Sequence, residues 1–261
     1  MKKIVYLFFA ATFFAVSCSS SDDTAAVVPS SGDTNFLPLS AGNYWVYNIS
    51  GNSETGRDSL FVANDTVIGA NTYKSFKTRN EPLGFFSSAL SNNGVKKDGD
   101  KIVVTGSTSL SISEEVPFTI GVSDFVLFKE SAQNNEVLAT VSGALNQEYN
   151  GLPITIDYTL KTTATGSLPS ITVNNQIYTN VKTVKTEIFA KLTTVFAGFP
   201  VVLLENQNIV TSTQFYAENV GCVKTVTDFG YVIQAEIAAQ LNIPASSQQH
   251  QEELLSTYSA E

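Results

Sequence analysis

Hydrophobic and polar residues alternate along most of the chain after residue 36. Thr, Val, Ile, Tyr and Phe recur at every second position, most clearly at 154–160, and Gly, Asn, Asp and Pro interrupt them. This period of two predicts strands with one apolar and one polar face, as in an antiparallel sheet. The predicted strands are 43–50, 57–63, 72–79, 101–112, 116–128, 136–145, 153–165, 181–196, 200–216 and 221–228.

Gly- and Asn-rich turns separate these strands, at residues 69–71, 93–94 and 174–175. Two of the turns belong to segments that resemble each other, 66–78 and 172–183. Each segment has a turn followed by Tyr-x-x-apolar-Lys-Thr. Convergent turn chemistry explains the similarity, and so do two related meander halves that build one curved sheet. Two copies are too few for a solenoid.

Helix signals are confined to the C-terminal part of the chain. Apolar residues spaced by four predict one short helix at 233–241, before Pro244. Ser246 with Gln249 resembles a capping box, which predicts a second short helix there, and 254–259 equally fits a last strand. We therefore expect a mainly β fold: a single antiparallel, curved sheet or open barrel-like domain with one or two short C-terminal helices.

The start of the chain has the composition of a secretory signal peptide. The pair Lys2-Lys3 precedes an apolar run at 4–16, which is shorter than the roughly 20 apolar residues that cross a bilayer. The run ends in Ala15-Val16-Ser17-Cys18, which resembles a bacterial lipobox with Ala15 in the place of the preferred Leu. The resemblance implies cleavage after residue 17 and lipidation of Cys18. A plain signal peptide with an incidental cysteine is the alternative.

Ser21, Asp22 and Asp23 follow the cysteine closely. Acidic residues at this place resemble the lipoprotein export signal of Bacteroidota-type bacteria, which implies the outer face of the outer membrane. A solvated tether that leaves the protein facing the periplasm is the alternative. The predicted organisation is a signal peptide at 1–17, a lipidated flexible tether at 18–35 and one β-rich domain at 36–261.

Two further segments resemble uncharacterised Bacteroidota lipoproteins. They are Pro-Leu-x-x-Gly-Asn-x-Trp-x-Tyr at 38–47 and Tyr-Ala-x-x-Val-Gly-x-Val-Lys at 216–224. The resemblance implies one antiparallel, β-rich domain without an established activity. Trp45 and Tyr47 share a strand face and are expected to anchor the core, with ligand stacking on Trp45 as the alternative. The glycine of each segment suits a tight turn or a close backbone approach.

Charge and cysteine content limit the partners. The formal charge is −9, and signal-peptide cleavage would also remove Lys2 and Lys3. Such an acidic chain repels phosphate backbones, so we expect no nucleic acid partner. Membrane association would come from the N-terminal lipid, because the chain has no polybasic patch. With Cys18 acylated, Cys222 has no disulfide partner and is expected to pack as a small apolar residue; a reactive thiol is the alternative.

Common catalytic and metal-binding patterns do not emerge. The single histidine, His250, reads as an exposed surface residue, and the chain has no nucleophile elbow, phosphate loop or zinc-ligand set. Asp98-Gly99-Asp100 fits a hairpin turn better than a calcium loop. We therefore assign no catalytic residue, metal or cofactor. The 24 acidic residues still allow a carboxylate pair for glycoside hydrolysis.

Three sites resemble the Asp-Ser/Thr-apolar O-glycosylation sequon of the same bacteria. The candidate acceptors are Thr24, Ser59 and Thr66. Thr24 is the best of them because it falls in the predicted tether. A chain rich in Ser and Thr contains about one such match by chance.

These observations predict a non-enzymatic, lipid-anchored β-domain at the outer membrane surface that binds a glycan, a lipid or a partner protein. The first alternative is a carboxylate-dependent glycoside hydrolase acting on surface polysaccharide. The second is a lipid carrier that holds an apolar ligand in a concave sheet, and the third is a subunit of a surface assembly. Sheet curvature alone does not distinguish them.

Overall fold

A computed structural model describes residues 35–261, except 53–54, 112–115, 150, 197 and 242. Twelve strands form one antiparallel sheet, accompanied by the short helices α1 (Phe85–Leu90) and α2 (Ala235–Leu241). The strands are β1 (Tyr44–Gly51), β2 (Thr55–Ile68), β3 (Asn71–Thr78), β4 (Gly94–Asp98), β5 (Lys101–Ser111), β6 (Pro117–Lys129), β7 (Val137–Tyr149), β8 (Leu152–Val173), β9 (Gln176–Phe196), β10 (Phe199–Ala217), β11 (Gly221–Val232) and β12 (Ser246–Ser259).

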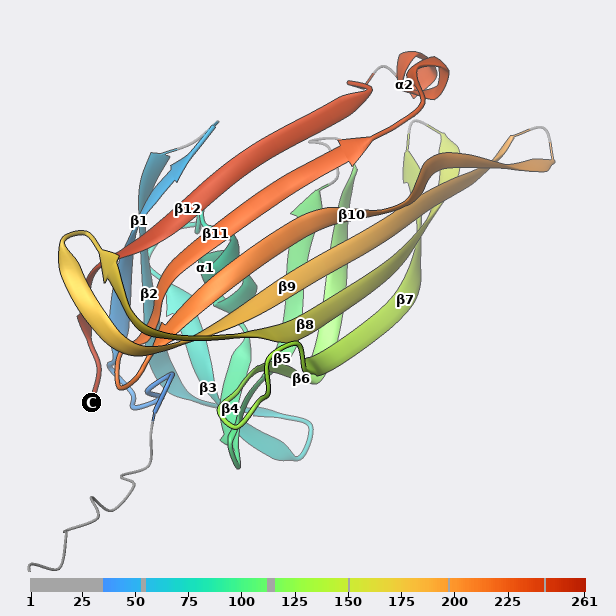
Figure 1. Ribbon diagram of the computed structural model, residues 1–261. Coiled ribbons are helices and arrows are strands. Elements are labelled where there is room, and N and C mark those ends of the chain that lie inside the picture. Colours follow the sequence, from blue (N-terminus) through green and yellow to red (C-terminus); the bar gives the residue numbers. More distant parts are fainter. Residues whose placement is uncertain (1–34, 53–54, 112–115, 150, 197, 242) are drawn as a thin grey trace, which may run out of the picture. The chain divides into compact units, whose positions relative to one another are not determined.

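The sheet is an up-and-down meander that curves until it is nearly closed into a barrel (Figure 1). Its strand order is β6-β5-β4-β3-β2-β1-β12-β11-β10-β9-β8-β7. The first and last strands therefore pair in the middle of the sheet, and β6 and β7 are its edges. The predicted fold class, a single antiparallel and barrel-like curved sheet, is confirmed.

Side chains link β6 to β8 and to the segment before β7. No backbone ladder is described between β6 and β7. Instead Thr162 Oγ1 on β8 donates to the carbonyl of Val126 on β6 at 2.7 Å, and Lys129 of β6 pairs with Glu136, just before β7, at 2.7 Å. Among the described residues, side chains and not a backbone ladder thus connect the two edges of the sheet.

The β1–β12 junction is fastened by two aromatic side chains that reach past β12. The indole N–H of Trp45 donates to the carbonyl of Val220 at 2.6 Å, and the hydroxyl of Tyr47 donates to the carbonyl of Cys222 at 2.8 Å. The segments 38–47 and 216–224 thus pack against each other. The expected core role of Trp45 and Tyr47 is confirmed, because both are almost completely buried.

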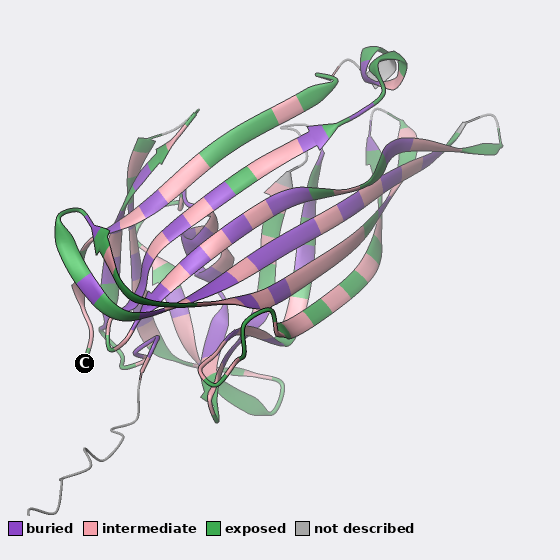
Figure 2. Ribbon diagram, in the orientation of Figure 1, coloured by how far each residue is buried: buried purple, intermediate pink, exposed green. Residues whose placement is uncertain are grey.

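The core fills the inside of the curved sheet, and inward and outward positions alternate along the strands (Figure 2). One buried cluster surrounds Trp45, and a second surrounds Ile156 and Ile188. Half-buried Val122 and Leu160 pack against both clusters. The two clusters are therefore continuous.

One predicted helix is wrong, and one observed helix was missed. Residues from Ser246 onward form β12, because they pair with β11 on one side and β1 on the other. Two ladders provide backbone partners that a short exposed helix lacks. The helix predicted at 233–241 is present as α2, whereas α1 and the short strand β4 were not predicted.

The two similar hairpins occupy comparable places. They are β2–β3 and β8–β9, six strands apart in chain order. Tyr73 and Tyr178, each the third residue of its returning strand, are buried, and so are Phe76 and Val181 three residues later. A six-strand spacing is what two related halves of a twelve-stranded meander require.

Gly221 provides a test of the junction. Its φ is +110°, and a Cβ there would lie 2.8 Å from the indole nitrogen of Trp45. We expect Gly221→Ala to lower the free energy of unfolding by about 2–4 kcal/mol, through backbone strain and displacement of the indole. Urea unfolding followed by the fluorescence of Trp45 measures this.

Gly42→Ala is the matched control, because Gly42 has a φ of +94° but open space around its Cβ position. It should lose only about 1–2 kcal/mol of backbone strain. Equal losses in the two variants would contradict the proposed contact with Trp45.

Candidate functional site

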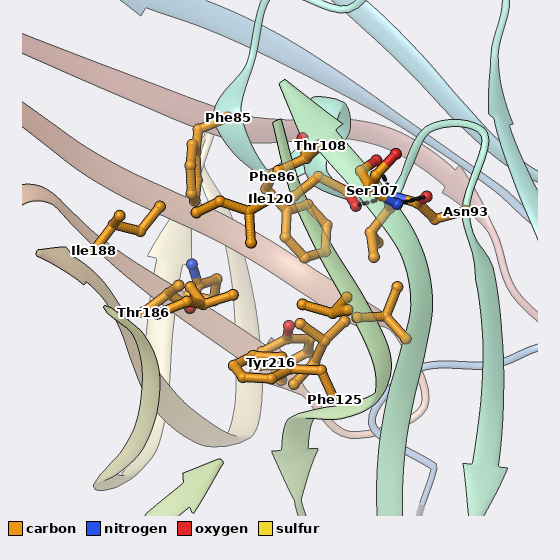
Figure 3. A pocket seen from close by; sticks show the side chains of 17 residues that line it. Phe85, Phe86, Asn93, Ser107, Thr108, Ile120, Phe125, Thr186, Ile188 and Tyr216 are labelled. Carbon is orange, nitrogen blue, oxygen red and sulfur yellow. Dashed lines mark hydrogen bonds between the residues drawn. The ribbon is translucent and has the colours of Figure 1, made fainter. Parts of the chain in front are cut away.

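A cavity lies inside the curved sheet, where the two buried clusters meet (Figure 3). The cavity has a volume of about 60 Å³, and the unoccupied space is about 680 Å³ when its open part is included. The smaller volume holds about five water molecules, and a larger ligand would also occupy the open part. The seventeen lining residues come from α1, the segment after it, β5, β6, β8, β9 and β10.

The cavity wall is mainly apolar and entirely uncharged among the described residues. Phe125 and Tyr216 lie together on one side in Figure 3, and Ile188 lies on another. Aliphatic side chains from β5, β6 and β8 complete the wall. Such a surface favours a hydrocarbon ligand, because each buried methylene contributes roughly 0.8 kcal/mol.

Helix α1 supplies one side of this wall. Phe85, Phe86, Ala89 and Leu90 all line the cavity. The helix lies inside the curve of the sheet (Figure 1) and comes between β3 and β4 in the chain. It has no side-chain cap of its own, so the first backbone N–H groups need acceptors from elsewhere.

Two buried carboxylates provide those acceptors. Asp58 on β2 accepts from the backbone N–H groups of Leu83 and Gly84, the latter at 2.8 Å. Glu253 on β12 accepts from Phe86 N at 2.6 Å, and from the backbone and the hydroxyl of Ser87. Negative charge there also interacts favourably with the positive N-terminal end of the helix dipole. The sheet wall thus holds α1 by its start.

Burial raises the pKa of Glu253 to about 7 from an ordinary value of 4.5. The hydrogen bonds from Phe86 and Ser87 oppose the rise, and the charge of nearby Asp58 adds to it. Neither carboxylate lines the cavity. Both carboxylates therefore hydrogen-bond to the start of α1, and neither lines the space that a substrate would enter.

A few polar side chains interrupt the apolar wall. Asn93 uses both N–H groups and its oxygen, donating to the carbonyls of Ala89 and Ser107 and accepting from Ser107 N at 2.8 Å. Gln214 and Thr186 form a second polar group of the wall, in which Thr186 Oγ1 donates to Gln214 Oε1 at 3.2 Å. Both of these side chains are buried.

Most residues singled out from the sequence lie away from the cavity. Cys18, Ser21, Asp22, Asp23 and Thr24 fall outside the described residues. The other two glycosylation candidates, Ser59 and Thr66, are half-buried residues of β2. Their modification is still a prediction.

Cys222 and His250 have the environments expected of them. Cys222 is completely buried, and burial raises the pKa of its thiol to about 12, so that very little reactive thiolate forms. His250 is an exposed residue of β12 whose ring nitrogen lies 2.7 Å from the Asp228 carboxylate. The segment 98–100 is the turn between β4 and β5.

The residues missed by sequence reasoning are Asp58 and Glu253. Each is an acid at an inward position of its strand, in line with Leu60 and Leu255 respectively. An acidic residue on an otherwise apolar strand face was the available signal.

Within the described part of the chain, no group of three or more acidic, histidine or cysteine side chains is placed to hold a metal ion. The helices of that part are all too short to traverse a bilayer. No protein-family model, curated protein or solved structure matches the chain. The site is therefore defined by its own geometry: an uncharged cavity in a nearly closed twelve-stranded sheet with an internal helix.

The raised pKa of Glu253 predicts a particular pH dependence of stability. The folded chain holds this proton more tightly than the unfolded chain, so the group's stabilisation is full below about pH 4.5 and is lost as the pH rises through about 7. The loss is about 3 kcal/mol at most. Between pH 5 and pH 8, the wild type should lose about 2–3 kcal/mol more than Glu253→Gln in urea unfolding.

Glu252→Gln is the control for net charge. Glu252 is half-buried and pairs with Lys224 at 2.6 Å. Its replacement leaves Glu253 in place, so this variant should keep the wild-type fall. The assignment to Glu253 fails if both variants have the same pH profile.

Proposed function

We propose that this protein is a lipid-anchored, non-enzymatic binding protein of the cell envelope whose β-domain holds an apolar ligand inside its curved sheet. The anchor would be Cys18, and the place would be the surface of the outer membrane. The single observation that supports ligand binding is the uncharged, largely apolar cavity between α1 and the sheet. Ligand sites of this kind favour a mostly apolar wall with a few polar groups.

The hydrolase alternative has less support. Glycoside hydrolysis needs two carboxylates on either side of a substrate-accessible space. The buried pair Asp58 and Glu253 instead accepts backbone hydrogen bonds from the start of α1. The arrangement therefore favours an apolar ligand.

Filling the cavity tests the proposed binding. The neutral apolar dye N-phenyl-1-naphthylamine should bind the wild type with increased fluorescence. Ile120 lines the cavity and is buried, so Ile120→Phe should weaken dye binding at least about tenfold by occupying the space. Fluorescence titration measures both affinities.

Ile177→Phe is the matched control, because Ile177 is 68% exposed and the same substitution there leaves the cavity unchanged. It should bind the dye as the wild type does. The proposal is wrong if the wild type does not bind the dye, or if the two Phe variants bind it equally well.

The anchor is tested by cysteine replacement in cells that express the full chain. Cys18→Ala should leave the membrane fraction, because one lipid-bearing residue supplies the hydrocarbon that holds an acidic chain to a bilayer. Cys222→Ala removes the other thiol and should stay in that fraction. Mass spectrometry should find acyl groups on Cys18, and surface protease should degrade the protein on intact cells.

Unmodified Cys18 in the native protein, or a Cys18→Ala chain that stays with the membrane after signal cleavage, would refute the anchor. Protection from the protease until the outer membrane is opened would refute the surface location alone.

A further inference from the structure

Gln214 is a buried amide in the cavity wall whose hydrogen-bonding capacity is only half used. Its side chain is 4% exposed. Its Oε1 accepts from Thr186 Oγ1 at 3.2 Å, and its Nε2 donates to Ser212 Oγ at 2.8 Å. A primary amide has two N–H donors and two acceptor lone pairs. One donor and one acceptor are therefore left without a partner among the described residues.

Such a half-used amide is unusual at this depth, because a buried polar atom without a partner costs free energy. Asn93, the other amide of the wall, has its oxygen and both N–H groups engaged by backbone atoms. Gln214 is held in place by Thr186 and Ser212, and Ser212 is itself paired with Thr227. The amide is thus oriented by the wall, with capacity left for a group in the cavity.

We propose that Gln214, positioned by Thr186, recognises the uncharged polar head group of a single-chain amphiphile, such as an alcohol or an ester, bound with its head group inward. This inference rests on the proposed function and names the ligand class of the same cavity. A hydroxyl accepts from the amide N–H and donates to the amide oxygen, which matches the unused pair. An ester carbonyl accepts from the N–H.

The uncharged cavity wall disfavours an ionic head group. The seventeen described lining residues are all uncharged. The buried acids Asp58, Glu187 and Glu253 are outside the lining. Asp58 and Glu253 are engaged by the start of α1, and Glu187 pairs with Lys161 and Lys185. An ionic head group would lose its hydration in this wall without gaining a counter-ion.

Head-group selection is tested with three amphiphiles of equal chain length, which compete with N-phenyl-1-naphthylamine on the full chain. We expect 1-decanol to bind at least about tenfold more tightly than decyltrimethylammonium and decyl sulfate. Gln214→Met keeps the length of the side chain and removes the amide. The variant should bind 1-decanol about five- to tenfold more weakly, and its affinity for the dye should change less.

A second pair of variants gives an answer even if Gln214→Met does not fold. Thr186→Val removes the hydroxyl that positions the amide, and should weaken 1-decanol selectively. Thr194→Val is its control on β9, because Thr194 is a buried threonine bonded to the carbonyl of Pro153 and does not line the cavity.

The outcomes separate this inference from the proposed function. If the wild type does not bind the dye, both fail together. If the dye and 1-decanol bind but Gln214→Met and Thr186→Val leave 1-decanol unchanged, the cavity stands and the head-group assignment is overturned. Equal binding of the charged and neutral amphiphiles overturns it as well.

Discussion

The hydrogen bonds that Trp45 and Tyr47 make to the start of β11 hold the first strand against the last. A meander of twelve strands has long-range pairing at only one place, between β1 and β12, and every other ladder joins strands that are neighbours in sequence. Closure therefore bears the largest loop-closure entropy of the fold. Two buried bonds that pass over β12 offset part of this cost, and Gly221 permits the indole to approach the backbone.

The number of strands then determines what the interior must contain. Side chains alone fill a barrel of about eight strands, whereas sixteen or more leave an open channel. Twelve strands lie between these limits, and α1 enters the space that the wall side chains do not fill. Phe86 of this helix packs edge-on against Tyr47 at 6.1 Å and against Tyr216 at 6.2 Å. The cavity is what is left beside the helix, so its size depends on where α1 is held.

The period-two pattern predicted most of the sheet because it reports burial on one face, which is local information. Sequence reasoning failed at the start of β12, where Ser246 and Gln249 resemble a capping box, because pairing with strands distant in sequence decides that segment. It also missed α1, whose six residues are too few to show a helical period and whose start is capped by Asp58 and Glu253 from other strands. The cavity could not be predicted for the same reason, since its wall joins α1 to five strands.

The two buried acids that contact α1 are kept out of the cavity lining. Asp58 and Glu253 are placed where backbone N–H groups can satisfy them, outside the cavity lining. The polar groups that line the cavity are neutral. Burial raises the pKa of Glu253 even though this acid accepts three hydrogen bonds from Phe86 and Ser87. A second charge brought by a ligand would face the same desolvation without such donors, so the anchoring of α1 and the neutrality of the cavity are consequences of the same constraint.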